Sequence, residues 1–184
     1  MRKGPYRITL LALALIAIAF LVNQYFIQFT GNGKKTPEEA LPTDSQYEWI
    51  DGPKTENEQR FFFLSNKKYF GTSVVTKNLK GWSAHERVSA SLPNPLEENK
   101  VTQAFSDQKI IYGLVKLSGE VKVDVNGVTA ELIDLNSLSE DVLSIYNVND
   151  YSIWYVQFSH LENHENFTIK LINSNNETIS ELSI

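Results

Sequence analysis

Two imidazoles and two carboxylates lie within six residues near the end of the chain, in the segment HLENHE at 160–165. Imidazole nitrogens and carboxylate oxygens are ligands that Zn²⁺ and similar divalent ions accept. His160, Glu162 and His164 are therefore candidate metal ligands. The alternative is a solvated polar loop between two strands, because His-x-x-x-His places both rings on one face only in a helix. The order also differs from the His-Glu-x-x-His of zinc proteases.

Trp82, Trp154 and Tyr155 are candidate binding aromatics, because exposed rings on a sheet can stack on sugars or anchor a partner protein. Trp154 and Tyr155 are adjacent, so in a strand their rings point to opposite faces. The alternative is that these rings complete a core. The Pro-rich segment SLPNPLEENK at 91–100 is a candidate recognition loop, with a plain surface crossing as its alternative.

Alternation of apolar and polar residues predicts the elements that carry these side chains. Valines at 121, 123 and 125 alternate with polar residues up to Asn126-Gly127, and the alternation resumes from 128 to 133. Asn-Gly between two such runs is the strongest short-range hairpin signal, since both residues tolerate the positive φ of a two-residue turn. A second hairpin is predicted from 167–171 and 177–184, around an Asn-rich turn.

Further strands are expected where β-branched and aromatic residues concentrate, and one short helix is expected at 139–146, where Ser139 is a suitable N-cap. About eight strands separated by turn residues predict an all-β fold, either a β-sandwich or an open barrel. The additional strand segments are 61–64, 72–75, 82–89, 110–117 and 151–158.

The N-terminal run ITLLALALIAIAFLV at 8–22 has no charge and no helix breaker, and it continues less purely to Phe29. As a helix, residues 8–29 would be about 33 Å long, enough to cross a hydrocarbon core of about 30 Å. Arg2, Lys3 and Arg7 precede the run and, by the positive-inside rule, hold the N-terminus in the cytoplasm. The sequence therefore predicts a transmembrane signal-anchor helix before the β domain, in a single-pass protein of the cell membrane.

The main alternative is a protein secreted after cleavage of a signal peptide at Ala17-Ile18-Ala19. Cleavage there would leave the apolar terminus Phe20-Leu21-Val22, which would adhere to membrane or aggregate. A buried core helix is the other alternative, and it would need a domain that surrounds the run on all sides, because the run has no polar face.

Charge and cysteine content exclude several classes of function. Three of the 17 basic residues precede the apolar run, which leaves 14 basic against 22 acidic residues after it, a formal balance of −8. A domain this acidic repels a phosphate backbone, and no nucleic-acid partner is therefore expected. The chain has no cysteine, and it contains neither the Gly-x-Ser-x-Gly of serine hydrolases nor a phosphate-binding Gly-rich loop. No catalytic residue and no cofactor is therefore assigned.

These patterns divide the chain into four segments. Residues 1–7 are a basic cytoplasmic tail, 8–29 the membrane helix, 30–46 a flexible spacer rich in Gly, Pro and charged residues, and 47–184 an extracytoplasmic β-rich domain. Lys34 and Lys35 in the spacer lie close enough to the helix to touch lipid headgroups. The layout resembles that of small exported proteins of Gram-positive bacteria, a resemblance of organisation that carries no catalytic residue.

Three functions fit this layout. The first is a non-enzymatic binding or sensory module of the cell envelope, whose partner is an envelope protein or polysaccharide. The second is a metal-dependent envelope enzyme that uses the loop of His160 and His164. The third is a membrane-anchored subunit of a larger complex, in which the hydrophobic helix itself makes the contact.

Overall fold

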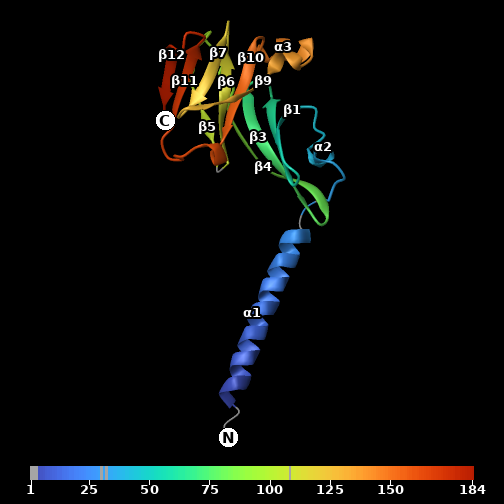
Figure 1. Ribbon diagram of the computed structural model, residues 1–184. Helices are drawn as coiled ribbons and strands as arrows, with labels where there is room; N and C mark the ends of the chain where they lie inside the picture. The colour runs from blue at the N-terminus through green and yellow to red at the C-terminus, as the bar shows by residue number, and fades with distance from the viewer. Residues whose placement is uncertain (1–3, 30, 32, 108) are drawn as a thin grey trace. The chain divides into compact units, whose positions relative to one another are not determined.

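A computed structural model describes residues 4–29, 31, 33–107 and 109–184 of the chain (Figure 1). Within this part the chain is mostly strand, in three antiparallel four-stranded sheets. The predicted all-β class is confirmed. The expected number of about eight strands is too low, since twelve are present among the described residues.

Helix α1 spans Gly4–Phe29 and belongs by its contacts to the same compact unit as the first sheet. Leu and Ala dominate its sequence, and both favour helix. Its side chains are described for residues 9–22 and 25, and in that range the large apolar side chains are exposed. Among the described residues, no helix combines the length and the apolar character that crossing a membrane requires.

The described chain divides into two compact units. The first holds residues up to 65 together with 70–90, and the second holds 66–69 together with 91–184. The sequence patterns did not indicate this division. The predicted boundaries at 7, 29 and 46 stay predictions.

The first unit contains one sheet with the strand order β1-β2-β3-β4. The segments predicted at 61–64, 72–75 and 82–89 lie within β2, β3 and β4, while β1 was not predicted. A cluster of buried side chains on this sheet includes Phe61 and Val75. The strands are β1 Tyr47–Lys54, β2 Glu58–Ser65, β3 Tyr69–Asn78 and β4 Gly81–Ser91.

Residues 33–42 of the segment predicted as a flexible spacer contact this sheet. Lys34 pairs with Trp82 through two backbone hydrogen bonds of 2.8 Å. The short helix α2, Pro37–Ala40, is capped by the hydroxyl of Thr36, and Leu41 after it is buried with Trp82 in the apolar cluster. The difference arises because Leu41 supplies apolar surface to the sheet, which composition averaged over the segment conceals.

The second unit contains two sheets whose buried side chains share one apolar core. One sheet has the order β5-β6-β10-β9 and the other β12-β11-β7-β8. Burial of each core side chain stabilises the unit by about 1.5–3 kcal/mol. The first sheet is formed by β5 Phe105–Ser106, β6 Ile110–Lys116, β9 Glu131–Asp134 and β10 Tyr151–Gln157, and the second by β7 Val121–Val125, β8 Val128–Thr129, β11 Thr168–Asn173 and β12 Thr178–Ser183.

Both predicted hairpins are present in the second unit. Asn126 and Gly127 form the turn between β7 and β8 with φ of 52° and 88°, and β11 pairs with β12. The return strand predicted at 128–133 is wrong as a single strand. After Ala130, whose N–H donates to the carbonyl of Val123, the chain leaves β7, and residues 131–134 pair with β10 in the other sheet, so this segment links the two sheets.

Short helices complete the second unit. The helix predicted at 139–146 is confirmed as α3, Glu140–Tyr146, which is capped by Ser139 and ends at Asn147 in the left-handed conformation. Two 3-10 helices, η1 Leu135–Ser137 and η2 Phe158–His160, follow β9 and β10. The loop with the predicted metal ligands therefore begins in η2 and leads to β11.

Candidate functional site

The two histidines of the predicted metal site have different surroundings. Nε2 of His164 lies 2.9 Å from the carbonyl oxygen of Phe158 and 3.0 Å from that of Leu161. Carbonyl oxygens only accept, so this nitrogen donates. The imidazole also stacks on the ring of Phe158, with 5.1 Å between centroids and 22° between planes. His164 thus closes the loop at the end of η2, and Nδ1 alone keeps a lone pair for a metal.

His160 and Glu162 instead line a shallow pocket of about 600 Å³ beside the Asn126-Gly127 turn. His164 is not among the described lining residues of that pocket. No group of three or more His, Asp or Glu side chains placed to hold a metal ion occurs in the described part of the chain. The structure therefore brings together two of the three predicted ligands and gives the third a hydrogen-bonding role.

The three candidate binding aromatics are all buried. Trp82 is 7% exposed in the core of the first unit, and Trp154 and Tyr155 are 0% and 6% exposed in the second. Trp154 and Tyr155 lie on opposite faces of β10, and both faces are covered. As folded, these rings offer little or no surface to a ligand. Their burial agrees with the alternative that they complete a core.

Tyr155 makes one specific polar contact from its buried position. Its hydroxyl donates a hydrogen bond to the carboxylate of Glu131, which lies directly across from it on β9. Burial, followed by this hydrogen bond and the charge of Glu131, raises the pKa of Tyr155 well above its usual value. The hydroxyl is therefore held as a donor, which ties the edge strand β9 to the sheet.

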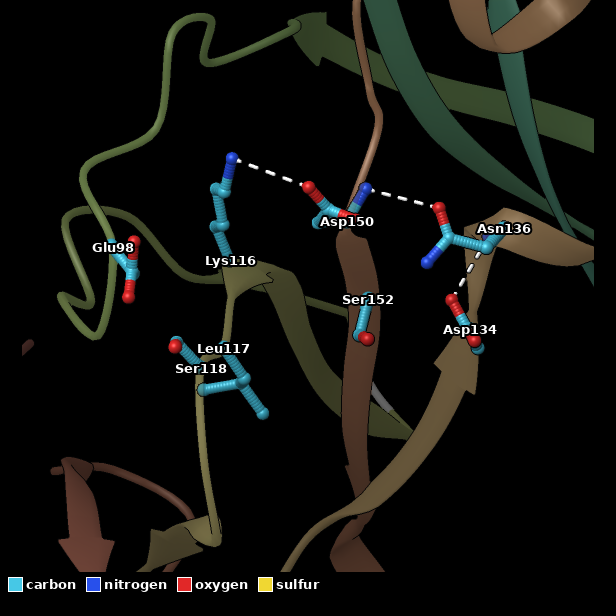
Figure 2. Close-up of a pocket in the computed structure, with 8 residues that line it drawn as sticks. All are labelled: Glu98, Lys116, Leu117, Ser118, Asp134, Asn136, Asp150 and Ser152. Carbon is cyan, nitrogen blue, oxygen red and sulfur yellow. Dashed lines mark hydrogen bonds and ion pairs between the residues drawn. The ribbon is translucent and has the colours of Figure 1, made fainter. Parts of the chain in front are cut away.

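A second pocket, of about 440 Å³, opens at one end of the sheet formed by β5, β6, β10 and β9 (Figure 2). Its lining combines three carboxylates, one ammonium group, two hydroxyls and one amide, and the single apolar side chain is a leucine. The lining residues are Glu98, Lys116, Leu117, Ser118, Asp134, Asn136, Asp150 and Ser152.

Three neighbouring strands position the centre of this pocket. Lys116 ends β6, Ser152 lies near the start of β10, and Asp134 ends β9, where it is paired directly with Ser152. Figure 2 shows Ser152 between Lys116 and Asp134. Ser152 lies two residues before Trp154, so its side chain shares the face of β10 that builds the core. The pocket thus lies where these three strands of one sheet end.

Side-chain to backbone bonds fix the rim on the β9 side. One oxygen of Asp134 accepts from the backbone N–H of Asn136 at 2.9 Å, and the amide oxygen of Asn136 accepts from the N–H of Asp150 at 3.0 Å. Asp150 has a φ of 62°, a conformation that Asp tolerates better than most residues. Its carboxylate lies 3.5 Å from the ammonium of Lys116, an exposed pair worth little by itself.

The Pro-rich loop at 91–100 supplies the opposite rim. Asn99 holds it against the end of β6, because its N–H donates to the carbonyl of Lys116 at 2.8 Å and its side chain exchanges two hydrogen bonds with the backbone of Ser118. Farther back, the amide of Asn94 donates to the carbonyl of Tyr146 at 2.8 Å. These contacts place Glu98 on the pocket.

The arrangement is suited to binding a ligand that carries hydrogen-bond donors. Three carboxylates can accept from hydroxyl or ammonium groups, while Lys116, the serines and Asn136 can donate in return. The charges of the lining sum to a negative value, which favours a neutral or cationic ligand over an anionic one.

Sequence reasoning found this site only in part. It marked the loop at 91–100, which carries Glu98, as a candidate recognition loop. Lys116, Asp134, Asp150 and Ser152 were missed, because each lies at a strand end and looks like ordinary turn chemistry until the strand order is known. No family model, curated protein or solved structure matches this chain, so the fold and the pocket define it as an all-β protein without assigning a family.

Proposed function

We propose that this protein is a membrane-anchored binding module of the cell envelope, whose second unit binds a donor-rich segment of an envelope polysaccharide or protein outside the cell. The proposal has two parts, an anchor and a binding site. Each depends on a different section of the chain.

The support for the anchor is the apolar run from Ile8 to Phe29 in the sequence. The backbone of α1 is helical across the entire run. Where side chains are described, between residues 9 and 22, leucine and isoleucine are exposed around the helix, which in water is costly. Arg2, Lys3 and Arg7 orient the anchor with the sheets outside.

The observation that carries the binding function is the polar pocket at the end of the sheet formed by β5, β6, β10 and β9. Its rim is held by hydrogen bonds from the 91–100 loop and from Asn136, so little conformational freedom is lost when a ligand binds. A ligand with hydroxyl or ammonium groups matches the carboxylates of Asp134 and Asp150.

The test is a binding titration of the full-length protein in detergent micelles. Two probes separate the ligand sources: a soluble bacterial cell-wall polysaccharide and a lysine-rich peptide. The double variant Ser152→Ala, Asp134→Asn should weaken binding of the preferred probe about tenfold or more, because a hydrogen bond to a charged group contributes about 1.5–3 kcal/mol.

The matched control is Asn163→Ala, a polar residue of the pocket beside His160. This variant should bind like the unmodified protein. Equal affinities of the double variant and the unmodified protein, or a loss confined to Asn163→Ala, would move the binding site away from the pocket in Figure 2.

A further inference from the structure

The hairpin between β3 and β4 has an exposed apolar tip surrounded by lysines. Leu79 is 73% exposed in the two-residue turn, the highest value among the large hydrophobic side chains of the described sheets and loops. Lys77 and Lys80 flank it, and both are exposed. We call Leu79 and the four lysines 34, 35, 77 and 80 the basic tip.

The chain that leaves α1 is bound to this hairpin. The ammonium of Lys80 donates to the carbonyl of Gly31 at 2.8 Å, and the N–H of Gly33 donates to the hydroxyl of Ser83 at 3.3 Å. A Cβ on Gly33 would lie 2.6 Å from the carbonyl oxygen of Lys80, so the close approach requires a glycine. Together with the pairing of Lys34 and Trp82, these contacts place the lysines at 34 and 35 beside the hairpin.

Chain length then limits how far Gly31, and with it the ammonium of Lys80, can lie from the end of α1. Gly31 is the second residue after Phe29, a step of about 7 Å of fully extended chain. This limit holds for any direction of the helix. The headgroup layer on each side of a bilayer is on the order of 5 to 8 Å deep, so the ammonium of Lys80, which is 2.8 Å from the carbonyl oxygen of Gly31, lies within reach of the headgroups at the end of a membrane helix.

We propose that the basic tip is a second membrane contact, which binds anionic lipid headgroups through its lysines and inserts Leu79 among them. This inference rests on the proposed anchor. Four lysines attract an anionic leaflet over about a Debye length, and they outnumber the carboxylate of Glu39, which accepts from the backbone N–H of Lys35 at 3.3 Å. The contact, together with the short connection, holds the first unit against the bilayer instead of leaving it on a flexible spacer.

The test uses the absence of native cysteines. Leu79→Cys in the full chain is labelled with an environment-sensitive fluorophore and reconstituted into vesicles of phosphatidylcholine and phosphatidylglycerol in equal parts. The emission should shift to shorter wavelength and be quenched by lipids that carry a nitroxide near the headgroup. Both effects should be lost in pure phosphatidylcholine and in 1 M salt, where the Debye length falls to about 3 Å.

Ser89→Cys is the matched control for probe position. Ser89 is exposed on β4, the strand that follows the turn of Leu79. It lies about 26 Å from Gly81 along this strand, so a probe there should stay in water. For charge, the triple variant Lys34→Gln, Lys35→Gln, Lys80→Gln should abolish the lipid dependence of the Leu79 probe. Lys67→Gln with Lys68→Gln, at the opposite end of β3, should leave it unchanged.

Flotation of the same vesicles separates this inference from the anchor. Protein that stays at the bottom of the gradient refutes the anchor and the membrane contact with it. Protein that floats while the Leu79 probe reports water in both lipid mixtures overturns the membrane contact alone. A probe that is shielded equally in both mixtures also overturns it, since shielding that does not depend on lipid charge is not binding to anionic headgroups.

Discussion

At the scale of single residues, the two histidines of the 160–165 segment show how one motif serves two roles. His164 donates to two carbonyl oxygens and stacks on Phe158, whereas His160 is on the surface of a shallow pocket. His164→Ala should lower the free energy of unfolding by about 1 kcal/mol, the usual value of such a hydrogen bond. His160→Ala should leave it within about 0.5 kcal/mol.

Denaturant unfolding in the presence of a chelator measures both variants without metal. Suppose that His164→Ala has the same free energy of unfolding as the unmodified protein in the chelator, and that both variants are less stable than the unmodified protein only when Zn²⁺ is present. The segment is then a metal site. The structural role assigned to His164 would then be wrong.

Tyr155 provides a prediction for alkaline pH. Burial and Glu131 raise the pKa of Tyr155 in the folded protein, while in the unfolded chain the phenol ionises near pH 10. Below that pH both states keep the proton and the stability is unaffected. As pH rises past about 10, the unfolded chain releases the proton first, so the free energy of unfolding falls.

Tyr155→Phe removes this contribution and should flatten the alkaline decline relative to the unmodified protein, although it loses about 1 kcal/mol at neutral pH with the hydrogen bond. Thermal unfolding from pH 7 to about 11.5, a range that brackets the ordinary phenol pKa, compares the two proteins. Parallel profiles would mean that other groups cause the decline.

The burial of the candidate aromatics is the main residue-scale difference from the sequence prediction. Trp154 pairs with Gly113 on β6, and a Cβ on that glycine would come within 2.8 Å of the indole. The glycine leaves the space in which the large ring lies flat on the sheet. Sequence alone does not show which residue is opposite Trp154, so it could not decide between a core ring and an exposed one.

At the scale of elements, local patterns predicted what local physics determines. The two hairpins, the strand at 151–158 and the helix at 139–146 were all recognisable, because alternation, an Asn-Gly turn and a Ser cap act within a few residues. The split of the 128–133 segment between two sheets was not predictable. It depends on β10 as the partner of residues 131–134, a pairing distant in sequence.

The turn between β7 and β8 also holds a third strand. The side chain of Asn126 accepts from the N–H of Thr168 at 2.8 Å and donates to the carbonyl of Asn166 at 2.9 Å. Asn126→Gly keeps the positive φ and loses both bonds, so it should cost about 1–2 kcal/mol of unfolding free energy. Asn126→Ala should cost about 1 kcal/mol more, because alanine disfavours that φ.

Denaturant unfolding of the two variants separates side-chain bonds from backbone conformation. If Asn126→Gly is as stable as the unmodified protein, the side-chain bonds to the start of β11 contribute nothing. The turn would then matter only for its φ values.

At the scale of the whole molecule, the alternating pattern and its turn residues predicted the all-β class but not the division into two compact units. Most of the candidate site could not be predicted from the sequence either. The carboxylates and hydroxyls of the pocket in Figure 2 are spread from Glu98 to Ser152, and only the strand order of one sheet brings them together. The contacts of residues 33–42 with the first sheet were missed because a few buried side chains outweigh a polar average.

Topology is the claim on which the proposed anchor, ligand and membrane contact all depend, and the chain's lack of cysteine allows it to be tested directly. Ser174→Cys, in the exposed turn between β11 and β12, and Arg2→Cys are treated separately in intact cells with a membrane-impermeant thiol reagent. We expect Ser174→Cys to be labelled and to remain in the membrane fraction, and Arg2→Cys to be labelled only after lysis. Labelling of Arg2→Cys but not of Ser174→Cys in intact cells would contradict the proposed topology.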